Sequence, residues 1–91
     1  MIELKNIKTK FLSKKLINDI CLLKDDHWKF GMPSQKEWFE SNNQKNDFHN
    51  LLFFKKKLIG YTSLKKKICY YNQSKQYYLL FDTLIINKKY R

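Results

Sequence analysis

The sequence predicts an α+β fold, with a mostly antiparallel sheet and the element order β-α-α-β-β-β. Three observations support this prediction. Apolar residues recur at helical spacing early in the chain, a helix-capping motif follows them, and after Phe48 the pattern changes to apolar runs separated by polar turns. A chain of 91 residues with 43% apolar residues can form one packed domain, residues 1–91.

The first two elements are predicted to be a strand and a helix. The weak alternation of apolar residues over Ile2–Lys10 indicates a strand. Apolar or aromatic side chains then recur three or four positions apart, at Leu12, Leu16, Ile20, Leu23 and His27. Ser13 is the expected N-cap, and the helix should end around Asp25–Trp28, before Gly31 and Pro33.

A second, shorter helix is predicted from a capping box. The Ser34 hydroxyl can accept from the amide of Glu37, whose carboxylate can reach back to the amide of Ser34. This helix should run to about Ser41, and the polar stretch 42–47 should be a loop.

The rest of the chain is predicted to form three consecutive strands. They cover Phe48–Phe54, Leu58–Tyr71 and Tyr77–Ile86. Lys55–Lys57 and Asn72–Lys75 are the expected turns, and Gly60 marks a bulge or a close contact. The last strand is apolar on both faces, so we expect helices on each side of the sheet.

The net charge of +11 comes almost entirely from lysine, because Arg91 is the one arginine among 19 basic residues. The chain has no Ala or Val and is rich in Lys, Asn, Ile, Phe and Tyr, which is typical of a genome rich in A and T. Nucleic-acid sites favour Arg, whose planar fork pairs with phosphate and guanine. We therefore expect a mostly solvated lysine surface, and nucleic acid is disfavoured as a partner.

A second group of residues supports an alternative function, that of a small binding module. Lys65–Lys67 precedes Cys69–Tyr71, and Lys75 precedes Tyr77 and Tyr78. Lysines interleaved with aromatic residues can neutralise phosphates and stack on bases. The other interpretation is a pair of half-buried strands with solvated lysines and core tyrosines. On the alternative, the chain is a small basic module that binds nucleic acid or a protein.

Other features of the sequence bear on cellular location, on the cysteines and on metal binding. No apolar run approaches the length of a membrane span and no signal peptide is visible, so we expect a cytoplasmic protein without membrane contacts. Cys21 and Cys69 are expected to be small core residues in a reducing compartment. His27 and His49 lack partner ligands at metal-binding spacing, so no metal site is expected.

Two segments resemble the GNAT superfamily of N-acetyltransferases. Residues 50–64 are similar to its second and third strands, a hairpin followed by an apolar-Gly-aromatic step at Ile59-Gly60-Tyr61. Residues 84–91, a buried strand end followed by Tyr90-Arg91, resemble the strand that enters the pyrophosphate-binding turn of this family. By architecture the resemblance covers nearly the whole chain, as the N-terminal part of such a domain.

The resemblance implies transfer of an acetyl group from acetyl-CoA to an amine. It implies that the backbone of Leu84, Ile85 and Ile86 pairs with the pantetheine arm, and that Arg91 takes the first position of the turn. The glycines of that turn are absent, since the chain has only Gly31 and Gly60. We therefore expect an incomplete acetyltransferase domain that is not active alone.

The resemblance also suggests catalytic and acceptor residues. Asp82 is the one carboxylate of the last strand and can serve as the base; the alternative is a structural carboxylate paired with Lys or Tyr. The loop Asp25-Asp26-His27-Trp28 takes the place of the amine-binding loop; the alternative is a helix end with solvated acids and Trp28 in the core.

A strand as apolar as Tyr77–Ile86 needs a neighbour on its outer edge. We expect self-association, or binding of a complementing chain, through the edge strand 77–86.

Overall fold

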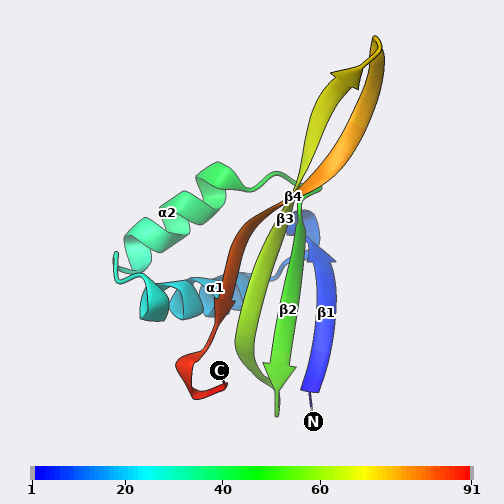
Figure 1. Cartoon of the computed structure of the whole chain (residues 1–91). Coiled ribbons are helices and arrows are strands. Elements are labelled where there is room, and N and C mark those ends of the chain that lie inside the picture. Colours follow the sequence, from blue (N-terminus) through cyan, green and yellow to red (C-terminus); the bar gives the residue numbers. More distant parts are fainter. Residues whose placement is uncertain (1, 91) are drawn as a thin grey trace.

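The computed structural model describes residues 2–90, except for the side chains of Lys66, Leu79, Phe81, Asp82 and Thr83. The predicted α+β class and order β-α-α-β-β-β are confirmed (Figure 1). The main elements are β1 Ile2–Lys8, α1 Lys14–His27, α2 Met32–Asn42, β2 Phe48–Phe54, β3 Lys57–Tyr71 and β4 Ser74–Ile86. Short 3₁₀ turns at Thr9–Phe11 and Lys88–Tyr90 follow β1 and β4.

The strands form one antiparallel sheet in chain order, β1-β2-β3-β4. The turn residues Lys55 and Lys56 both have positive φ, as do Asn72 and Gln73 in the next turn. Two such residues in succession match the right-handed twist of the flanking strands, which closes both hairpins tightly. β3 and β4 are about twice the length of β1 and β2, so the hairpin that they form continues beyond the rest of the sheet (Figure 1).

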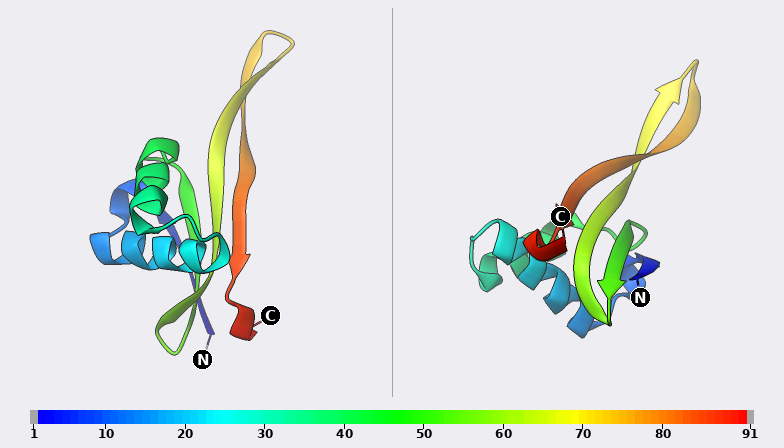
Figure 2. Two further views of the ribbon diagram at one scale, coloured as in Figure 1. Left: turned by 90° about the vertical axis from the view of Figure 1, so that its left-hand side faces the viewer. Right: turned by 60° about the horizontal axis from the view of Figure 1, so that its bottom comes forward.

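Both helices cover the same face of the sheet, which corrects the expectation of helices on each side (Figure 2). Leu51, Tyr61 and Ile85 are neighbours across β2, β3 and β4, and they are almost completely buried. They pack against Ile20, Cys21 and Leu23 of α1 and Phe39 of α2. On the opposite face Leu4 and Leu84 are 70% and 72% exposed. At the end of β4, alternation therefore buries Ile85 against the helices and leaves Leu84 on the uncovered face.

The start of α1 agrees with the sequence prediction and the start of α2 does not. The Ser13 hydroxyl accepts the amide of Leu16 at 3.1 Å, as expected for an N-cap. α2 begins two residues before Ser34, with Gly31 as N-cap and Pro33 in its first turn. Gly31 has φ +90° and its amide donates to Asp25 Oδ1 at 2.7 Å. A proline favoured at a helix start thus overrides the capping box.

Gly60 lies beside a β-bulge, as predicted. The register changes between Leu52 and Phe53, which pair with Gly60 and Leu58, so Ile59 is the extra residue. A Cβ on Gly60 would lie 3.2 Å from Cβ of Leu52. Cys21 is buried as expected, but Cys69 is exposed, because its part of β3 lies beyond the core.

Candidate functional site

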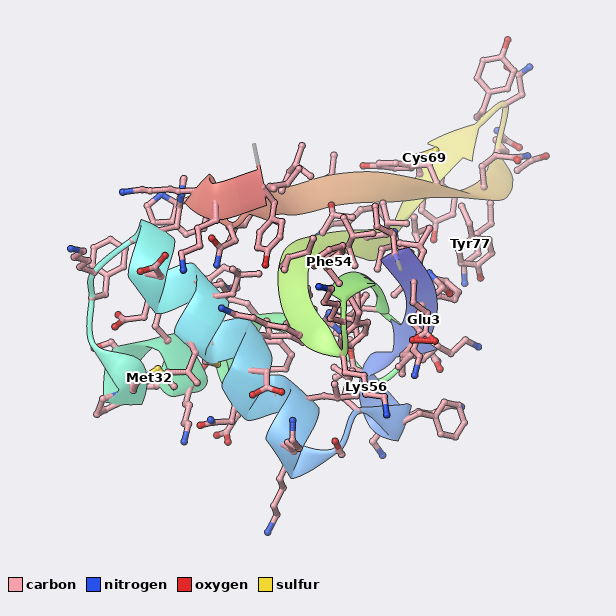
Figure 3. All side chains as sticks on the ribbon, turned by 90° about the horizontal axis from the view of Figure 1, so that it is seen from below. Glu3, Met32, Phe54, Lys56, Cys69 and Tyr77 are labelled. Atoms are coloured by element: carbon pink, nitrogen blue, oxygen red, sulfur yellow. The ribbon has the colours of Figure 1, made fainter. Side chains whose placement is uncertain are left out.

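A groove of about 380 Å³ lies where α1, the β2–β3 turn and the end of β4 meet. Its lining residues are Lys15, Asp19, Leu22, Leu23, Asp26, Lys56, Lys57, Leu58 and Asn87. Three lysines and two carboxylates surround an apolar floor, so the groove can hold a ligand with an apolar body and charged ends. Figure 3 views the molecule from this end, with Lys56 labelled.

Asp19 and Asp26 come from one side of α1, because seven residues correspond to two helical turns. Lys15 Nζ lies 2.9 Å from Asp19 Oδ2, but Lys15 is largely exposed and such a pair contributes little to stability. Asp19 already has Lys15 within ion-pair distance, so Asp26 is the groove carboxylate better placed to hold a cationic ligand.

Of the four predicted acceptor residues, the structure places only Asp26 in the groove. Asp25 accepts the amide of Gly31, which fixes the start of α2. His27 ends α1 and its ring lies edge-on to Trp28, at 4.7 Å between ring centroids. Trp28 is 40% exposed rather than in the core, and its carbonyl accepts the side-chain amide of Gln35 at 2.7 Å. The helix end is thus held by local hydrogen bonds.

The end of β4 lies beside the groove. Ile85 points into the core, whereas Leu84 lies on the uncovered face and Ile86 is 37% exposed. The amide of Asn87 donates to the carbonyl of Ile59 at 2.7 Å, and this is the last backbone link of β4 to β3. β4 is the outermost strand of the sheet in residues 2–90. Its outer edge therefore faces no further strand there.

Two predicted residues fall wholly or partly outside the described part of the chain. Arg91 lies outside it entirely, and for Asp82 only the backbone is described. Ser63 pairs with Thr83 and Leu64 pairs with Phe81, so Asp82 is the additional residue of a second irregularity in the ladder. Bulges are frequent beside active sites, where they redirect a side chain. The catalytic role of Asp82 stays a prediction.

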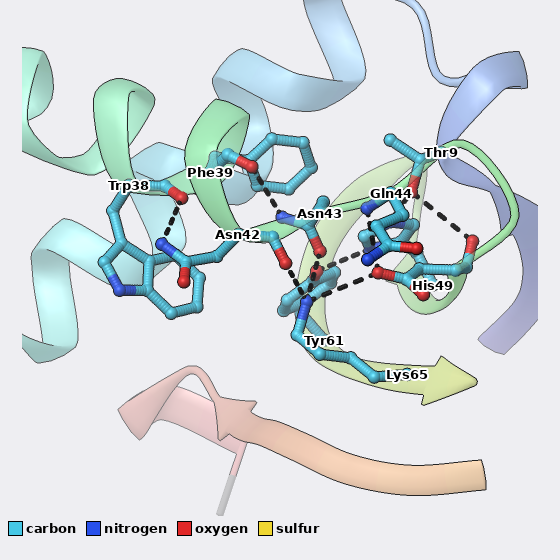
Figure 4. Close-up of polar contacts among 10 residues, drawn as sticks. Thr9, Trp38, Phe39, Asn42, Asn43, Gln44, His49, Tyr61 and Lys65 are labelled. Carbon is cyan, nitrogen blue, oxygen red and sulfur yellow. Dashed lines mark hydrogen bonds and ion pairs between the residues drawn. The ribbon is translucent and has the colours of Figure 1, made fainter. Parts of the chain in front are cut away.

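Sequence reasoning missed a buried polar network at the opposite end of the helix-covered face (Figure 4). His49 is fully buried, with Nδ1 2.6 Å from Tyr61 Oη and Nε2 2.7 Å from Thr9 Oγ1. A neutral ring protonated at Nε2 satisfies both contacts, donating to Thr9 and accepting from the Tyr61 hydroxyl. Burial, and then the positive charge of Lys65, lower the pKa of His49 from 6.5 to about 4.

The same network buries an ion pair. Lys65 Nζ lies 3.4 Å from Asp47 Oδ2 and also donates to Asn43 Oδ1 and to the carbonyl of Asn42. Lys65 and Asp47 are 9% and 4% exposed. These contacts tie the end of α2 and the following loop to β3. His49, Lys65 and Asp47 are buried, so these hydrogen bonds join distant segments of the fold. A lysine triplet in sequence gave no sign that its first member is buried.

The comparisons with known proteins give no family: no family model matches the chain, and no curated protein matches its sequence. None of the helices in residues 2–90 is long and apolar enough to cross a membrane. Across the described residues, no group of three or more His, Cys, Asp and Glu side chains is placed to hold a metal ion.

Proposed function

We propose that this chain forms part of an N-acetyltransferase of the GNAT type, in which acetyl-CoA lies along the outer edge of β4 and an amine approaches Asp26. The observation that carries the proposal is the position of Leu84–Ile86. This segment ends an edge strand, and the next residue, Asn87, lines the groove beside α1. Acetyl-CoA would supply the thioester-bound acetyl group, and the chain would bind and orient both reactants.

Two features of the described residues fit a long, anionic donor. An edge strand offers backbone groups to an extended ligand, as in recognition of peptides by strand addition. Lys56 and Lys57 of the β2–β3 turn line the groove together with Asn87, which follows β4, and phosphate groups near there would need positive charge. Instead of the glycine turn of the family, Lys88–Tyr90 forms a 3₁₀ turn, with the amide of Lys89 donating to Asn87 Oδ1 at 3.0 Å.

The acceptor side of the proposal depends on Asp26. Its carboxylate can hold an ammonium group at the groove, and Leu22 and Leu23 supply an apolar wall for the carbon chain of the amine. The neighbouring Asp25 is occupied by the amide of Gly31. Asp82 as base and the cytoplasmic location stay predictions beside this proposal.

Binding, rather than turnover, is the decisive measurement, because the chain alone is expected not to be active. Titration of the ¹⁵N-labelled chain with acetyl-CoA should give its largest amide shifts at Leu84–Asn87 and at Lys55–Lys57. Pantetheine alone should shift β4 and leave the lysine turn unchanged. Shifts that are absent, or spread evenly over the sheet, would contradict the proposal.

Matched variants separate specific binding from general attraction to a basic protein. Lys56→Gln with Lys57→Gln should weaken acetyl-CoA binding about tenfold, since charged hydrogen bonds contribute roughly 1.5–3 kcal/mol each before solvent screening. The control Lys29→Gln changes an exposed lysine away from the groove. For the acceptor side, Asp26→Asn should reduce the shifts caused by a polyamine, and the exposed Glu37→Gln on α2 should not.

A further inference from the structure

The outer half of the β3–β4 hairpin projects from the molecule as a two-stranded ribbon (Figures 1 and 2). β2 pairs with β3 only from Lys57 to Leu64. Beyond that point β3 and β4 pair only with each other within residues 2–90, from Lys65 and Leu80 to Tyr71 and Ser74. We define residues 65–80 as the ribbon. An isolated two-stranded hairpin is marginally stable in water, so this length of uncovered ribbon requires an explanation.

The ribbon exposes its aromatic side chains. Tyr70 and Tyr71 are 73% and 71% exposed, and Tyr77 and Tyr78 are 53% and 48% exposed. The interpretation of these residues as core tyrosines is therefore wrong. The pairing of Ile68 with Tyr77 places Tyr70 and Tyr77 on one face, and the other two tyrosines lie on the opposite face. Figure 3 shows Tyr77 on the ribbon, away from both helices.

The charge of the ribbon has a single sign. The sequence holds no Asp or Glu between Asp47 and Asp82, so the ribbon and the strands leading to it carry only lysines. Lys67 and Lys75 are exposed, and Lys75 Nζ lies 5.4 Å from the centre of the Tyr77 ring. Lys65 is part of the buried ion pair and anchors the base of the ribbon. The exposed surface is thus cationic and aromatic, which complements a polyanion with planar groups.

We propose that the ribbon binds single-stranded nucleic acid, with bases stacked on its tyrosines and phosphates neutralised by its lysines. Diagonal neighbours such as Tyr70 and Tyr77 lie about 7–8 Å apart in an antiparallel pair, which is enough for one base between two rings. Unpaired bases expose the faces that stacking requires, whereas paired bases do not. The scarcity of Arg argued against nucleic acid, but stacking with lysine contacts needs no bidentate readout of bases. This function is independent of acetyl transfer.

The test is fluorescence anisotropy of a labelled single-stranded oligonucleotide with the full chain at several salt concentrations. The logarithm of the binding constant should fall by about 0.7 per unit of log salt for each phosphate neutralised on a single strand. The two exposed ribbon lysines, Lys67 and Lys75, therefore predict a slope of about −1.4. Tyr70→Ala and Tyr77→Ala, on one face of the ribbon, should each weaken binding by about tenfold or more, from the effect of alanine substitution on base stacking. Both side chains are exposed, so neither substitution should disturb folding. A duplex of the same sequence should bind more weakly.

Matched controls decide between stacking and simple charge attraction. Tyr70→Phe should retain binding, because the ring is kept. Phe30→Ala removes an aromatic side chain that is 71% exposed but far from the ribbon in sequence and fold, and it should have no effect. Lys75→Gln should reduce the salt slope by about 0.7, and Lys29→Gln should reduce it by less.

Several results would overturn the proposal. No measurable binding at low salt would do so, as would equal weakening by Tyr70→Ala and Phe30→Ala. If heparin binds tightly and no tyrosine variant weakens that binding, the ribbon binds polyanions through its charge alone. Tyrosine variants that alter only the sedimentation of the chain, with oligonucleotide binding unchanged, would assign the ribbon to a protein contact instead.

Discussion

Replacing His49 with Gln should remove a pH dependence of stability that the fold imposes on one buried ring. His49 is fully buried between Tyr61 and Thr9, and its pKa is lowered from 6.5 to about 4. In the unfolded chain the ring takes up a proton as the pH falls through 6.5, whereas in the folded chain it stays neutral until about pH 4. The unfolded state then binds more protons, so stability is full above about pH 6.5 and is lost as the pH falls towards 4.

The size of the effect follows from the two pKa values. Each pH unit in this window costs up to about 1.4 kcal/mol, so roughly 3 kcal/mol of unfolding free energy should be lost between pH 6.5 and pH 4. Urea unfolding of the original chain and of His49→Gln, at half-unit steps from pH 7.5 to 4.5, measures it. The variant should be the less stable protein at pH 7.5, and the difference should shrink or reverse at pH 4.5. Parallel stability curves for the two proteins would refute the reasoning, because all other titrating groups are shared.

Three further predictions concern packing, charge and association. Lys65→Met should lower the unfolding free energy by about 3–5 kcal/mol, because it leaves the buried Asp47 carboxylate without its cation, and adding Asp47→Asn should restore part of the loss in urea titrations. Gly60→Ala should cost about 1–3 kcal/mol in thermal or urea unfolding, since the new Cβ would lie 3.2 Å from Cβ of Leu52; a variant as stable as the original would show that the bulge relaxes easily. Leu84→Lys should change stability by no more than about 0.5 kcal/mol, because this side chain is 72% exposed, yet it should reduce self-association in sedimentation velocity. A monomeric original chain would contradict the expected role of the uncovered face and edge.

Local chemistry was sufficient to predict most elements. Ser13 begins α1 because a serine hydroxyl can accept an amide of the first turn, and this interaction needs no distant partner. β2 and the long β3 were likewise predicted from their apolar residues and the polar turns between them, without information on strand pairing. The predicted start of α2 was wrong although it too depends on local residues. Gly31 serves as the N-cap in place of Ser34, and Pro33 lies in the first turn.

The site and the surfaces depended on contacts between distant segments. Nothing in the sequence distinguishes Lys65 from its neighbours, yet it is buried against the loop at Asp47, whereas Lys67 is exposed. Cys69 and Tyr70 have the composition of a core strand, but they are exposed, because β2 ends its pairing at Leu64.

Residue types and short-range spacing were therefore enough to predict the fold class, the order of elements and the lysine-rich charge. Contacts between distant segments set which sheet face the helices cover, which acidic residues line the groove, and which tyrosines project into solvent. These outcomes depend on where strands stop pairing and on which side of a strand each residue falls.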